Sequence, residues 1–142
     1  MKKKKIFLLI LPILALILEI IPCGAVCVFA NPDGEVTRKL YSYFSLVPYG
    51  YANFSPLIVG VLTCIITALT VIYLIKRKRM TVVFAEFLTW ICASLSLCPL
   101  IYGTEFYSVV GGLISASLFL QAIIIHKHTL KTKGSQKCTT LL

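Results

Sequence analysis

Four long apolar runs constrain this chain more than any other feature of its sequence. They cover Ile6 to about Ala30, Leu57 to Ile75, Val82 to Tyr102 and Phe106 to Ile125. An α-helix needs roughly 20 residues to cross the hydrocarbon core of a bilayer, and these runs are about that long or longer. Every backbone amide in hydrocarbon must be paired within the protein, so we expect the runs to be helices. The sequence therefore predicts an all-α, polytopic membrane protein with a bundle of four transmembrane helices over residues 1–126.

Composition excludes an ordinary soluble domain. The chain is 58% hydrophobic and 13% charged, with a mean hydropathy of +0.93. Soluble domains carry about 25% charged residues. The lipid bilayer is therefore the first expected partner.

The positive charges, which leave a formal net charge of +9, predict one orientation. Basic residues gather at Lys2–Lys5, at Lys76–Arg79 and in the tail after Ile125. All three clusters fall on one side if four helices cross in sequence, and by the positive-inside rule that side is cytoplasmic. We expect a multi-pass protein of the cell membrane with both termini inside and residues 31–56 outside. The clusters would attract anionic lipid, and we expect no nucleic-acid partner.

The first run contains two prolines, which interrupt helical hydrogen bonding. Pro12 and Pro22 predict a bent helix or one whose regular part ends near Ile21. The same segment also resembles a signal peptide that would be cleaved after Ala30. Its length and the presence of Glu19 favour retention, but cleavage would leave three helices with the same orientation.

The outer loop is rich in aromatic residues and predicts a small structure of its own. Asn31–Glu35 is a turn by composition, and apolar residues from Val36 to Val47 recur at helical spacing. This spacing predicts a short amphipathic helix on the outer surface. The aromatic rings suit either anchoring at the lipid headgroups or recognition of a partner. The candidates for this surface are Tyr41, Tyr43, Phe44, Tyr49, Tyr51 and Phe54.

The last two runs and the tail complete the predicted architecture. A few residues around Gly103 join the third and fourth runs, which should form an antiparallel hairpin. Small residues such as Ala85 and Gly112 recur along them and allow close helix approach, within the chain or in a homo-oligomer. The basic tail, 127–142, has no sign of a packed core and is predicted to be disordered.

Glu19 is the strongest candidate for chemistry, because an ionisable group is expensive to bury in a membrane. Helix counting places it at the level of Thr63 or Cys64, Ser94 or Ser96, and Ser115. None of these is a cation, so we expect a neutral carboxyl that hydrogen-bonds to a neighbour. Glu19 either specifies helix packing in this way or is a proton or cation site.

Glu86 has a simpler interpretation, since it lies close to the start of its helix, where the dipole favours an anion. Gln121 should lie at a similar depth, so we expect a structural polar pair between these two side chains. His126 and His128 have no acidic partner nearby in the sequence and are expected to be solvated.

No motif of an enzyme is present. Six cysteines invite a metal or disulfide interpretation, but none of their spacings is a CxxC. Cys23, Cys27 and Cys98 are expected near the outer surface, where a disulfide is geometrically open to them. We expect no catalytic residues, no metal and no cofactor.

Two segments, "GAVCVFANPDGE" and "YSYFSLVPYGYANFSP", resemble a group of small bacterial four-span membrane proteins without assigned function. The resemblance covers roughly residues 19–80 and implies an architecture rather than site residues. The chain is also similar to small multidrug-resistance transporters, which have four short helices and a carboxylate in the first. That similarity implies a role only for Glu19, and the long outer loop and strong charge bias depart from it.

The sequence thus favours a non-enzymatic integral membrane protein that acts through membrane or protein contacts at its aromatic outer loop. The alternative is a small proton- or cation-coupled transporter that uses Glu19.

Overall fold

A computed structural model describes the backbone of residues 2–30, 36–50 and 53–139 and the side chains of 8–29, 36–49 and 53–130. The predicted turn at Asn31–Glu35 and the candidate Tyr51 lie outside the described residues. In chain order the elements are α1 Lys2–Ile20, β1 Ala25–Ala30, β2 Val36–Tyr41, α2 Leu46–Gly50, α3 Ser55–Lys76, α4 Arg79–Leu95, the short 3-10 helices η1 Cys98–Tyr102 and η2 Thr104–Phe106, and α5 Val109–Thr139.

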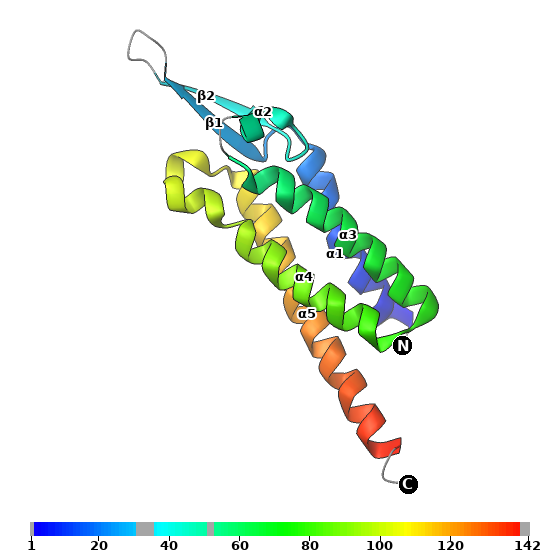
Figure 1. The fold of residues 1–142 in the computed structure, drawn as a ribbon. Coiled ribbons are helices and arrows are strands. Elements are labelled where there is room, and N and C mark those ends of the chain that lie inside the picture. The colour runs from blue at the N-terminus through cyan, green and yellow to red at the C-terminus, as the bar shows by residue number, and fades with distance from the viewer. Residues whose placement is uncertain (1, 31–35, 51–52, 140–142) are drawn as a thin grey trace.

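The four long helices pack side by side into a bundle. Helix α1 packs against α3 and α5, and α4 packs against the same two helices. Figure 1 shows the β-hairpin at one end of this bundle and the N-terminus beside the α3–α4 connection at the other. Arg77, with φ 51°, caps α3 in the left-handed conformation and lets the chain reverse within two residues into α4.

Three of the helices are long and apolar enough to cross a membrane, by length and composition: Ser55–Lys76, Arg79–Tyr102 and Val109–Leu130. They make the chain compatible with a membrane protein. Helix α1 begins with four lysines, and among its described side chains the apolar stretch is Leu8–Ile20. That α1 is a fourth span stays a prediction.

The predicted first helix, Ile6 to about Ala30, is too long at its C-terminal end. The regular helix contains Pro12 and ends at Ile20, close to the end near Ile21 that the prolines predict. Residues 25–30, counted as helix, form β1 instead.

The amphipathic helix predicted between Val36 and Val47 is also corrected. Val36–Tyr41 is strand β2, which pairs antiparallel with β1 in a register that runs from Ala25 opposite Tyr41 to Ala30 opposite Val36. Among the described residues from Val36 to Phe54, only Leu46–Gly50 are helical. Both strands are rich in β-branched and aromatic residues, which favour a pleated ribbon, and pairing of the two runs satisfies their backbone groups.

The bounds of the last two helices differ from the prediction as well. Helix α4 ends at Leu95, and the predicted continuation to Tyr102 is the 3-10 helix η1. Pro99 explains the break, because a proline removes a helical donor and restricts the residue before it. Helix α5 begins at Val109 and continues to Thr139, through most of the tail that was predicted to be disordered.

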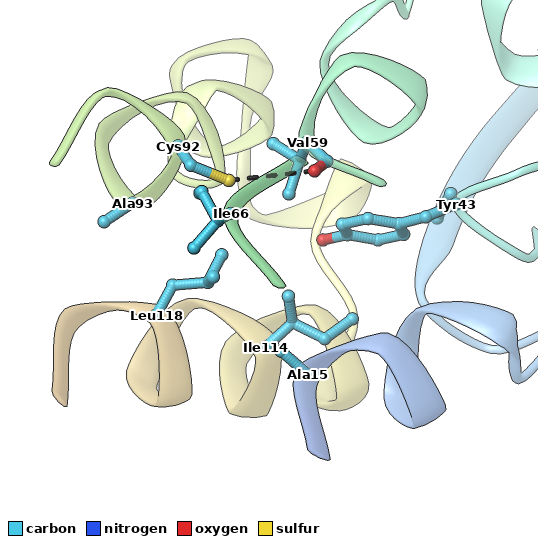
Figure 2. Packing of buried hydrophobic residues seen from close by; sticks show 9 residues of the cluster. Ala15, Tyr43, Val59, Ile66, Cys92, Ala93, Ile114 and Leu118 are labelled. Carbon is cyan, nitrogen blue, oxygen red and sulfur yellow. Dashed lines mark hydrogen bonds between the residues drawn. The ribbon is translucent and has the colours of Figure 1, made fainter. Parts of the chain in front are cut away.

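Two clusters of buried apolar residues form the core. The larger joins all four helices to the outer loop and includes Ala15, Ile66, Cys92 and Ile114. Figure 2 shows these side chains facing one another, with Tyr43 reaching in from the loop. The smaller cluster lies toward the other end and contains Leu8, Tyr73, Val82 and Ile125.

Candidate functional site

One end of the helix bundle carries a platform made of β1, β2, α2, η1 and η2, and polar contacts fix it to the rest of the chain. The Ser108 hydroxyl donates to the Gly24 carbonyl at 2.7 Å and accepts from the Gly111 amide at 2.9 Å. Ala25 forms an isolated antiparallel bridge with Tyr107. The Arg38 guanidinium donates to the backbone carbonyl of Glu105. The hairpin is therefore attached to the start of α5 along its base.

Tyr43 is not on the outer surface, where the aromatic pattern placed it. Its side chain is 3% exposed and belongs to the core, and its amide donates to the Glu19 carbonyl at 3.0 Å. Burial, together with Tyr107 nearby, raises the pKa of the Tyr43 hydroxyl. The Tyr43 side chain therefore packs the loop onto the helix bundle. Its role is in packing rather than in recognition.

The other predicted aromatic residues divide between packing and exposure. Tyr41 is half-buried and packs on the core, whereas Phe44 lies against Gly60 and is partly open. Tyr49 and Phe54 are both 46% exposed and pack edge to face with their ring centroids 4.8 Å apart. Of the five candidates whose side chains the structure describes, three are exposed at the surface: Phe44, Tyr49 and Phe54.

Several apolar side chains of the platform were missed by sequence reasoning. Leu46 is 71% exposed, and on η1 Ile101 is 82% and Tyr102 67% exposed. Sequence reasoning missed the exposure of Ile101 and Tyr102 because these residues continue the apolar run of the third predicted helix. Pro99 was the signal that could have separated them, since the chain leaves the helix before it.

The second candidate site is Glu19, which is fully buried at the outer end of α1. Its Oε1 lies 2.8 Å from the hydroxyl of Thr63, one of the predicted neighbours. The same hydroxyl lies 2.9 Å from the Val59 carbonyl oxygen. Within the described part of the chain, Glu19 Oε2 has no hydrogen-bond partner.

These distances bear on the state of the carboxyl. A hydroxyl carries one hydrogen, so Thr63 cannot donate fully to both oxygens. Threonine hydroxyls in helices commonly donate to the carbonyl four residues earlier, which here is that of Val59. The contact with Glu19 is then satisfied if the carboxyl carries a proton and donates to Thr63. The hydrogen bond to Thr63 is thus present as expected, and the neutral state of the carboxyl stays a prediction.

The remaining predicted neighbours of Glu19 lie elsewhere. Cys64 and Ser94 are exposed on the outside of their helices. Ser115 contacts the Tyr107 hydroxyl at 2.6 Å and donates to the Ser96 carbonyl at 3.3 Å. Helix counting therefore missed the outward rotation of Cys64 and Ser94, whereas Ser115 is buried but bonds to other groups.

One neighbour was missed by sequence reasoning. The thiol of Cys92 lies 3.6 Å from the Thr63 hydroxyl. Its helical register, one turn after Thr89 on the buried face of α4, was the signal that could have found it.

The predicted polar pair between Glu86 and Gln121 does not form. Glu86 Oε1 instead accepts from Nδ1 of His126 at 2.6 Å, and Gln121 is 1% exposed with neither amide atom partnered among the described residues. His126 therefore has the acidic partner that it was expected to lack. The reason is rotation: five residues on a helix separate two side chains by about 140°, so Gln121 faces the core while His126 faces α4.

The cysteines whose side chains are described, Cys23, Cys27, Cys64, Cys92 and Cys98, are free thiols. No family model, curated protein or solved structure matches the chain.

Proposed function

We propose that this chain is an integral protein of the cell membrane that acts through contacts of its outer platform and carries out no catalysis. Both termini are proposed to be cytoplasmic, which puts the hairpin, α2 and η1 outside. The likeness to small bacterial four-span proteins belongs to the same proposal. The proposed membrane location and orientation rest on the charge asymmetry and the apolar helices described above.

The observation that carries the proposal is the contrast between the base and the top of the platform. At its base, polar contacts such as Ser108 to Gly24 and Arg38 to Glu105 hold the backbone in place. At its top, apolar side chains such as Leu46, Ile101 and Tyr102 are open. A fixed frame that presents apolar groups loses little conformational entropy when it binds another surface. Anchoring to headgroups alone would not require such a frame.

Site-specific photocrosslinking in intact cells tests this proposal. A benzophenone side chain at Leu46, Tyr49 or Tyr102 should give one protein adduct of the same mass from all three positions. Phe84, which is 58% exposed on the middle of α4, is the matched control and should give only lipid adducts. The proposal fails if the outer positions give the same products as Phe84.

A second candidate function is a proton or cation site at Glu19, and one observation favours it. A fully buried carboxyl has an oxygen without a partner among the described residues. Such an oxygen can accept a proton or contact an ion that enters the bundle. This reading makes the chain a small coupled transporter.

Proton flux into proteoliposomes that contain a pH-sensitive dye separates the two functions. Glu19→Gln keeps the shape of the side chain and removes its acid, so a transporter should lose flux. Glu86→Gln is the control and should keep it. If wild-type vesicles show no flux above that of Glu19→Gln, the transporter hypothesis is wrong and the contact proposal is untouched.

A further inference from the structure

A groove runs along the outside of the bundle between α4 and α5. Its volume is about 590 Å³, and it extends on α4 from Arg79 to Trp90, with His126 and Leu130 on the α5 side. Arg79 and Trp90 are eleven residues apart, or about 16 Å along a helix axis. That length is about half of the ~30 Å hydrocarbon core, so the groove matches one leaflet rather than the whole bilayer.

The walls of the groove are apolar and are not covered by the rest of the protein. Met80 is 80% exposed, Phe87 62% and Leu130 52%. In a membrane, hydrocarbon would fill such a concave strip. The volume and the elongated shape suit one acyl chain better than a compact ligand.

The charged groups of the groove lie apart along its length, with Arg79 at one end of the α4 stretch and Glu86 seven residues further along it. Arg79 begins α4, directly after the exposed residues Lys76, Arg77 and Lys78. Glu86 is the acidic residue of the lining, and its carboxylate is engaged by His126 at 2.6 Å. The end of the groove near Arg79 therefore carries an excess of positive charge, complementary to a phosphate.

We propose that this groove binds one anionic phospholipid of the leaflet that faces the α3–α4 connection. An acyl chain lies along Val83, Phe87 and Trp90, and the anionic headgroup lies beside Arg79. The inference requires α4 and α5 to be in the membrane but is independent of what the outer platform contacts. The proposed site gives the general attraction of basic residues for anionic lipid one defined position on the protein.

The single tryptophan of the chain makes the site measurable, because Trp90 lines the groove. Bromine on an acyl chain quenches tryptophan fluorescence on contact. The protein is reconstituted into mixed vesicles in which either phosphatidylglycerol or phosphatidylcholine is brominated, at equal mole fractions. We expect Trp90 to report a preference of about fivefold for phosphatidylglycerol, the effect of one basic residue on an anionic lipid.

Four variants locate the preference. Arg79→Gln should reduce the ratio toward one, whereas Lys76→Gln, in the same basic segment but outside the lining, should leave most of it. Val83→Phe fills the groove and should reduce quenching by both brominated lipids. Moving the reporter with Trp90→Phe and Phe84→Trp places it on the exposed face of α4 outside the lining, where the two lipids should quench equally. Circular dichroism and elution volume check that each variant is folded.

Two results would overturn the proposal. Equal quenching of wild-type Trp90 by both lipids would mean that the groove holds ordinary annular lipid. Weak quenching by both lipids that rises when the protein is diluted in lipid would mean that a second copy of the chain covers the groove.

Discussion

Two polar sites near opposite ends of the helix bundle, Glu19 and the Glu86–His126 pair, differ in how far the protein encloses them. Near the platform, Glu19 and Tyr43 are enclosed by the core, and the contacts of Ser108 are made to backbone groups. At the other end, Glu86 and His126 pair on an open face, where the His126 side chain is 50% exposed. An enclosed polar group depends on its neighbours, whereas an open pair is easily replaced by solvent or lipid headgroups. The difference predicts where substitutions destabilise the protein.

The largest expected effect is at Glu19. Glu19→Ala removes a buried side chain and leaves a cavity, so the free energy of unfolding should fall by about 2–4 kcal/mol. Glu86→Ala, at the open end, should change it by less than about 1 kcal/mol. Unfolding by dodecyl sulfate in mixed micelles measures both.

The isosteric variant Glu19→Gln separates volume from charge. A neutral carboxyl is closely mimicked by an amide, so this change should be within about 1 kcal/mol of wild type. A loss as large as that of Glu19→Ala would mean that the native group is a carboxylate with a cation partner.

A somewhat smaller effect is expected where the platform meets the bundle. A Cβ at Gly24 would lie 2.9 Å from two ring carbons of Tyr43, and that ring is enclosed by the core. Gly24→Ala should therefore lower the free energy of unfolding by about 1–3 kcal/mol through overpacking. The matched control is Gly112→Ala, where the nearest atom is 3.6 Å away and alanine favours the helix. If Gly24→Ala were as well tolerated as the control, the core would not hold the Tyr43 ring in a fixed position.

Two threonines on α3 compare the enclosed contact with an ordinary one. Thr63 contacts Glu19 on another helix, whereas Thr70 donates to the Ile66 carbonyl of its own helix. Thr63→Val should destabilise by about 1 kcal/mol because it leaves the carboxyl without its partner. Thr70→Val should cost about half as much or less. Equal losses in the same micelle assay would contradict the cross-helix role of Thr63.

The smallest expected effect is chemical rather than energetic. Burial raises the pKa of the Cys27 thiol on β1, so its reactive thiolate should form only at higher pH than in the unfolded chain. Maleimide labelling of Cys27 can be followed by mass spectrometry across a pH series. The labelling rate should increase at a higher pH in the folded protein than in the unfolded chain. Coincident profiles with and without denaturant would mean that the hairpin is open.

Much of the helical architecture could be predicted from apolar length alone. The second run, Leu57 to Ile75, is helix α3 from Ser55 to Lys76, because no charged residue or proline interrupts it and Pro56 suits a helix start. The prolines of the first run correctly predicted an end near Ile21. Thr63 as a neighbour of Glu19 followed from counting residues along antiparallel helices.

The hairpin could not be predicted by the same reasoning. Ala25–Ala30 continues an apolar run, and its strand character depends on pairing with Val36–Tyr41 beyond the intervening turn. The apolar residues of the second segment also fit a helical spacing, so periodicity alone was ambiguous. The partner of Glu86 was missed for a related reason, since depth along a helix says nothing about rotation around it.

Helix α5 has a mechanical consequence. Its 31 residues make a continuous rod about 46 Å long, well beyond the ~30 Å hydrocarbon core. One end of this rod is attached to the platform next to Ser108, and Figure 1 shows the other end projecting past the remaining helices. A tilt of about 10° at the platform would displace the far end by about 8 Å. A given rotation of α5 at the platform would therefore correspond to a much larger displacement at its other end.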